Sequence, residues 1–180
     1  MVGRWIMVGL CAALAACSGV NSALQRDPTA IAMLAPTEGN TASGVVEFEQ
    51  DGDIMHVHLR IEGLPPNTTH GLHIHEKGDC RAPDASSAGG HFNPHGSAHG
   101  GADTEIRHAG DLGNIRADAN GTVEMKLQVT ALSLGTDADS IIGRAVIVHA
   151  QADDLVSQPS GNAGPRIACG LISKNPDKFF

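Results

Sequence analysis

Apolar and polar residues alternate with a period of two along most of this chain, and this pattern restricts its fold more than any other feature. Such a period places every second side chain on the same face of a β-strand. Turn pairs such as Asp51-Gly52 and Asn120-Gly121 separate the alternating segments. No segment has a convincing helical period, although residues 129–134 have room for a turn. The sequence therefore predicts an all-β sandwich or barrel of about eight antiparallel strands, at residues 31–35, 45–49, 54–61, 71–75, 112–116, 122–129, 144–149 and 167–172.

Two long segments without a strand pattern interrupt the alternation, at residues 76–108 and 150–165. The first is rich in Gly, Pro, Ser, Asp and His. A loop of that length inside a compact domain is uncommon unless it has a function. Because the 180 residues contain no internal repeat, we expect one domain over residues 30–175 with two long functional loops.

Residues 1–17 have the character of a secretion signal, in which Arg4 precedes an apolar run that ends in Leu-Ala-Ala-Cys17. The run is shorter than the roughly 20 apolar residues of a permanent membrane span. Its end resembles a bacterial lipobox, in which the Cys is lipidated and becomes the first residue of the mature chain. The alternative is a plain Ala-rich cleavage site. We favour the lipobox because polar residues 18–29 follow as a flexible tether, which predicts export to the periplasm or cell envelope and a lipid anchor through Cys17.

Cys80 and Cys169 are the other cysteines that such an exported chain retains, since Cys11 leaves with the signal. An oxidising compartment favours a disulfide between them. Two buried free thiols, or metal ligation by the pair, are the alternatives.

Acidic residues outnumber basic ones by 20 to 12, which gives a formal net charge of −8. A surface of this sign repels phosphate groups. Nucleic acid is therefore not expected as a partner.

The chain contains 10 His residues, and His is the commonest metal-ligating side chain. His73 and His75 would project from one face of a strand, about 7 Å apart. His149 ends a separate strand and can reach the same point if the two strands are neighbours. Imidazole alone suits Cu(II), whereas imidazole with one carboxylate suits zinc. The long loop and the residues directly after it contain three imidazoles and one carboxylate, namely His91, His99, His108 and Asp111. We expect the remaining histidines not to bind metal, namely His56, His58, His70 and His95.

Seven short blocks follow one another between residues 30 and 172, namely 71–75 (GLHIH), 90–94 (GHFNP), 99–101 (HGG), 107–114 (RHAGDLGN), 143–149 (GRAVIVH), 152–155 (ADDL) and 161–170 (GNAGPRIACG). Together they resemble the copper,zinc superoxide dismutases. The resemblance implies an eight-stranded antiparallel Greek-key sandwich or flattened barrel. It also implies an enzyme that converts superoxide to oxygen and hydrogen peroxide, through a copper redox cycle with a structural zinc.

The resemblance assigns a role to each candidate residue. One copper would be bound by His73, His75, His91 and His149, and one zinc by His91, His99, His108 and Asp111. Asp153 would join a copper ligand to a zinc ligand. Arg166 would bind the substrate anion and act with His91 in catalysis, and Cys80 would form the disulfide with Cys169. A homodimer stays open, because members of this family differ in how they dimerise.

Two other classes of function stay open on the residues alone. One is a copper-binding or copper-delivery module on the same fold, and the other is a surface lipoprotein that serves as an interaction module. The presence of Arg166 and Asp153 beside a complete ligand set favours the enzyme. Since residues 150–165 contain no Lys or Arg, any steering of the substrate beyond Arg166 is expected from the basic residues of the first loop, namely Lys77, Arg81 and Arg107.

Overall fold

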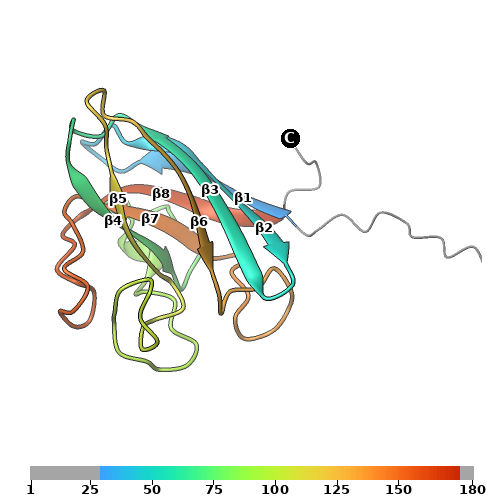
Figure 1. Ribbon diagram of the computed structural model, residues 1–180. Coiled ribbons are helices and arrows are strands. Elements are labelled where there is room, and N and C mark those ends of the chain that lie inside the picture. Colours follow the sequence, from blue (N-terminus) through green and yellow to red (C-terminus); the bar gives the residue numbers. More distant parts are fainter. Residues whose placement is uncertain (1–28, 175–180) are drawn as a thin grey trace, which may run out of the picture.

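Eight antiparallel strands form a nearly closed barrel in the computed structural model, which describes residues 29–174 (Figure 1). The strands lie in the order β5-β4-β7-β8-β1-β2-β3-β6, and β5 comes close to β6 at the open seam. The prediction of an all-β, eight-stranded antiparallel fold is confirmed. The strands are β1 (Thr29–Pro36), β2 (Ser43–Asp51), β3 (Ile54–Glu62), β4 (Thr69–His75), β5 (Asp111–Arg116), β6 (Val123–Val129), β7 (Ala145–His149) and β8 (Arg166–Lys174).

The residues that alternate with a period of two in the sequence form the core, as β3 illustrates. Every second residue of this strand is buried in the barrel, whereas His56 and His58 lie between them on the outer face. Burial of such an aliphatic side chain contributes about 1.5 to 3 kcal/mol to stability. The inward-facing residues of β3 are Met55, Val57, Leu59 and Ile61.

Strands β4 and β7 differ from β3 because both of their faces are buried. All five residues of β7 are buried, and so is every residue of β4 after Thr69. Their inner face joins the core, and their outer face lies under the two long loops that follow β4 and β7 (Figure 1). Polar side chains on this outer face are therefore shielded from water.

The loop after β4 has a defined structure, although the sequence shows no strand pattern there. A single 3-10 turn, Ser86–Ala88, is the one helical element in the described residues. The amide of Lys77 donates to the carbonyl of Ala88 over 3.0 Å. Cys80 forms a disulfide with Cys169 of β8, which fastens the loop to the barrel.

The predicted secretion signal, Cys17 and nearly all of the tether lie outside the described residues. Thr29, the last residue assigned to the tether, begins β1. In the range 129–134, where the sequence leaves room for a turn, Val129 ends β6 and the residues after it form bends and an isolated β-bridge at Ser133 instead of a helical turn. Between residues 29 and 174, no helix is long and apolar enough to span a membrane.

Candidate metal centre

Four imidazoles meet on the outer side of β4 and β7, and we call them the first cluster. His73 and His75 alternate with core residues on β4 and so face outward. His149 ends the adjacent strand β7, and His91 of the long loop forms a β-bridge with His75. One potential ligand atom from each imidazole lies within 4.8 Å of the others, so the cluster can hold one metal ion; its members are His73, His75, His91 and His149.

Backbone carbonyls decide which nitrogen of His75 and His149 faces the first cluster. Nδ1 of His75 lies 2.9 Å from the Gly89 carbonyl, and Nδ1 of His149 lies 3.1 Å from the Gly164 carbonyl. A carbonyl only accepts, so each Nδ1 carries the hydrogen and each Nε2 presents a lone pair. The two Nε2 atoms are 3.4 Å apart. Burial lowers the pKa of His75 to about 2 and that of His149 to about 3, so a metal cation, not a proton, suits this gap.

A second cluster adds a carboxylate to three imidazoles, a donor set typical of zinc. Oδ1 of Asp111 lies 2.8 Å from Nδ1 of His91, and Oδ2 lies 3.0 Å from Nδ1 of His99. Burial opposes ionisation of this carboxyl, but hydrogen bonds from His91 and from the amides of His108 and Gly100 outweigh it and lower the pKa of Asp111. The second cluster therefore carries a negative charge that a cation would balance; its members are His91, His99, His108 and Asp111.

His91 belongs to both clusters. Its Nδ1 is near Asp111 and lies 3.4 Å from Nδ1 of His108 in the second cluster. Its ring centroid lies 4.0 Å from that of His73 in the first. The side chain is only 4% exposed, and among the described residues its Nε2 has no hydrogen-bond partner. One imidazole can thus link two metal ions.

The carboxylate of Asp153 links the two clusters through one imidazole of each. Its Oδ2 accepts a hydrogen bond from Nε2 of His73 over 2.7 Å, and its Oδ1 accepts from Nε2 of His99 over 3.0 Å. Both imidazoles are thereby fixed with Nδ1 toward a cluster. Asn114 holds the backbone of Asp153 through two hydrogen bonds of 2.8 Å. A Cβ on Gly161 would overlap the Asp153 carboxylate, so glycine is needed there.

The donor atoms fit bound metal ions. Three buried ring nitrogens at the clusters make no hydrogen bond to any described residue. Leaving a buried polar atom without a partner costs about 1 to 3 kcal/mol. Metal coordination would satisfy all three, namely Nδ1 of His73, Nε2 of His91 and Nδ1 of His99.

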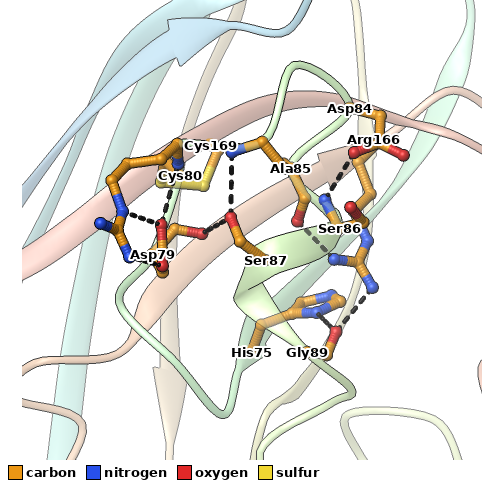
Figure 2. The surroundings of a disulfide bond; sticks show 12 residues. His75, Asp79, Cys80, Asp84, Ala85, Ser86, Ser87, Gly89, Arg166 and Cys169 are labelled. Atoms are coloured by element: carbon orange, nitrogen blue, oxygen red, sulfur yellow. Dashed lines mark hydrogen bonds and ion pairs between the residues drawn. A yellow bond between two sulfur atoms is a disulfide. The ribbon is translucent and has the colours of Figure 1, made fainter.

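Arg166 stands beside the first cluster and is held by the disulfide-linked loop (Figure 2). Its guanidinium donates to the carbonyls of Ala85, over 2.5 Å, and Gly89, over 2.6 Å. The Gly89 carbonyl also accepts from His75, so one backbone group orients both the cation and a candidate ligand. Arg166 is the first residue of β8, three residues before Cys169.

A pocket of about 420 Å³ gives access to this centre. His91, His149 and Arg166 line it, and Pro159 and Ser160 of the second long loop form part of its wall. No other Lys or Arg of the described chain lines this pocket. The three basic residues expected to steer substrate have other partners: Nζ of Lys77 lies 3.9 Å from Glu76, Arg81 pairs with Asp79 at 2.6 Å, and Arg107 donates to three backbone carbonyls.

The four histidines expected not to bind metal lie outside both clusters. His70 is buried, and its Nδ1 lies 2.8 Å from the carbonyl of His149, so it holds the end of β7 in place. His95 is exposed and pairs with Asp139.

Gln158 supports the second cluster, although it is not among the residues predicted from the sequence. Its Oε1 accepts from the amide of His99 over 2.8 Å, and its Nε2 donates to the carbonyl of the same residue over 2.9 Å. No residue pattern marks a side chain that binds only backbone groups of a distant loop.

Comparison with known proteins agrees with this geometry. The model of the family described as copper/zinc superoxide dismutase (SODC) matches residues 42–172. The chain is 42% identical over 155 residues to "Superoxide dismutase (Cu-Zn)" of Paramecium bursaria Chlorella virus 1, covering 83% of this chain and 81% of the relative. It is 38% identical over 157 residues to "Superoxide dismutase (Cu-Zn) 2" of Aquifex aeolicus, covering 85% and 91%. It is 39% identical over 163 residues to "Extracellular superoxide dismutase (Cu-Zn)" of Brugia pahangi, covering 86% and 80%.

Proposed function

Since the chain belongs to the copper/zinc superoxide dismutase family, with copper and zinc as its cofactors, we propose that it dismutes superoxide outside the cytoplasm at the centre described above. The first cluster would hold copper, because four imidazoles suit Cu(II). The second would hold zinc, because its donors are three imidazoles and one carboxylate. Copper supplies reversible one-electron redox chemistry, and zinc has none.

His91 is the residue that carries this assignment, because its two ring nitrogens face different clusters. In the reaction one superoxide loses an electron and leaves as oxygen, while another gains that electron and two protons and leaves as hydrogen peroxide. His91 lines the pocket, and its buried Nε2 has no hydrogen-bond partner among the described residues. Whenever this nitrogen is not bound to a metal ion, its lone pair can take up a proton and deliver it to the reduced substrate.

Arg166 would bind the substrate anion. A guanidinium has five N–H donors, of which the Ala85 and Gly89 carbonyls engage one on each terminal nitrogen. The remaining donors can bind an oxygen anion in the pocket that this side chain lines. Because the chain carries a net charge of −8, this local cation opposes a general repulsion of superoxide.

The proposed location rests on three observations. Residues 1–17 have the pattern of a secretion signal that ends in a lipobox. The disulfide between Cys80 and Cys169 suits an oxidising compartment. Similar proteins from Brugia pahangi and Haemonchus contortus are named extracellular superoxide dismutases. Together they favour an exported chain, and the lipobox alone adds an anchor in the cell envelope through a lipid on Cys17.

Two experiments test the proposal. Superoxide consumption by protein loaded with copper and zinc is compared with that of metal-depleted protein, and His91→Ala is measured beside His95→Ala, an exposed histidine outside the centre. Activity should depend on copper and fall in His91→Ala only; equal activity in both variants would contradict the role of His91. For the location, Cys17→Ala should move the protein from the membrane fraction to the soluble envelope fraction, and unchanged membrane association would refute the lipid anchor.

A further inference from the structure

A second pair of histidines with i, i+2 spacing lies on the outer face of the barrel. His56 and His58 alternate on β3 with buried core residues, and both are partly exposed. Strand β3 pairs with β2 and β6 and does not border β4 or β7. This pair is therefore separate from the two buried clusters, although it has the same spacing as His73 and His75.

Carboxylates flank the outer pair on both sides. The strand register places Glu47 opposite His58, and Glu49 opposite His56, on the neighbouring strand β2. Nδ1 of His58 lies 3.5 Å from a carboxylate oxygen of Glu47. On the other side, Nε2 of His58 lies 4.0 Å from a carboxylate oxygen of Glu124 on β6.

Contrary to the expectation from the sequence that His56 and His58 do not bind metal, we propose that this face of β2, β3 and β6 binds one divalent transition-metal ion, with these two residues as the principal ligands. Imidazoles at i and i+2 on one rigid strand project in the same direction, which makes them a bidentate pair. Imidazole binds nickel, copper and zinc, and the neighbouring carboxylates supply oxygen ligands and negative charge. We name this set the β3 site; it comprises His56, His58, Glu47, Glu49 and Glu124.

The β3 site differs from the buried clusters in its rigidity. Among the described residues, only the two buried clusters already hold three or more ligand atoms within 4.8 Å of one another. At the β3 site Nδ1 of His56 lies 3.4 Å from the side-chain nitrogen Nε2 of Gln128, so a turn of the ring is needed to bring this Nδ1 toward His58. Such a turn is open to a partly exposed side chain, and it makes the site weaker and faster to exchange than the buried centre.

The test uses the protein with both buried clusters filled by copper and zinc, and Ni²⁺ as the probe. Calorimetric titration at neutral pH should detect one Ni²⁺ per chain. His56→Gln together with His58→Gln should weaken this binding by about tenfold or more, because the bidentate pair is lost. His95→Gln is the matched control, because His95 is another exposed histidine beside a carboxylate but has no partner at i+2.

Paramagnetic Ni²⁺ should also broaden the NMR signals of the His56 and His58 rings before those of His95. The proposal is overturned if the loaded wild type takes up no Ni²⁺, if the double variant binds it equally well, or if His95→Gln removes the binding. Because the β3 site lies outside the catalytic pocket, superoxide consumption should be the same in all three proteins. A failed Ni²⁺ titration would leave the proposed enzymatic function untouched.

Discussion

Adding one methyl group at Gly161 should disturb both metal sites without removing any functional atom. Gly161 has a φ of +64°, and a Cβ there would lie 2.7 Å from Nε2 of His99 and overlap the Asp153 carboxylate. In Gly161→Ala the carboxylate must move away from the two imidazoles that it orients, His73 and His99. The claim under test is that Asp153 positions ligands of both clusters.

The size of the effect follows from these contacts. A non-glycine residue in the left-handed region costs about 1 to 2 kcal/mol. Each hydrogen bond to the charged carboxylate that weakens costs up to about 1.5 to 3 kcal/mol. Loss of partners that orient metal-ligating histidines reduces metal affinity by about 10- to 100-fold. Gly161→Ala should therefore lose both stability and affinity for copper and zinc.

Gly96→Ala separates the steric effect from the backbone effect. Gly96 has a φ of +66°, and nothing lies within 4 Å of a Cβ built there. Gly96→Ala should lose a similar amount of stability through its backbone conformation, which urea unfolding of the metal-free protein measures. Its affinity for both metals, measured in competition with a chelator, should equal that of the wild type. Equal metal affinities in the two variants would refute the argument that Asp153 must be held in place.

Three further predictions concern the pocket, the disulfide and pH. Arg166→Ile should lower the rate constant for superoxide by about tenfold or more with metal content intact, and an unchanged rate would remove Arg166 from substrate binding. Replacing Cys80 and Cys169 by Ser should lower the free energy of unfolding by up to about 4 to 5 kcal/mol, because the disulfide closes a loop with a sequence separation of 89. A urea unfolding curve that matches that of the wild type would contradict this. Metal-free protein should lose stability as pH falls from 6.5 toward 3, by about 1 kcal/mol per pH unit for each of His75 and His149, because burial lowers the pKa of both imidazoles and the unfolded chain therefore binds more protons in this range. A flat dependence of the unfolding free energy on pH in this range would exclude the effect.

The fold could be predicted from the sequence because its strands bury one side chain in two. The pattern located all eight strands but shortened most of them. Strand β8, expected at residues 167–172, extends over Arg166–Lys174, where Ser173 and Lys174 continue the pairing with β1. Backbone hydrogen bonds hold these polar ends, and hydropathy does not record such bonds.

Spacing and resemblance selected the side chains that the structure brings together in the two clusters, and Asp153 behind them, but not the backbone groups that orient two of the imidazoles. His56 and His58 have the same i, i+2 spacing as His73 and His75. The two pairs differ in burial, because the long loops cover β4 and leave the outer face of β3 open. The carbonyls of Gly89 and Gly164 fix the orientation of two imidazoles. A carbonyl belongs to every residue, so no sequence pattern distinguishes them.

The basic residues of the first loop stay a prediction as groups that steer the substrate. Lys77, Arg81 and Arg107 were candidates for steering because they carry charge close to the ligands in sequence. The fold engages each of them with a carboxylate or with backbone carbonyls, and none of them lines the pocket. Arg166 alone provides a cation there among the described residues.

Anomalous X-ray diffraction from crystals of the copper- and zinc-loaded protein, recorded at the absorption edges of both metals, tests the central claim most directly. Two peaks should lie on opposite sides of the His91 ring, copper at the Nε2 side and zinc at the Nδ1 side. The copper peak should fall among His73, His75 and His149. A single peak, or two peaks of which only one contacts His91, would contradict the shared-histidine centre.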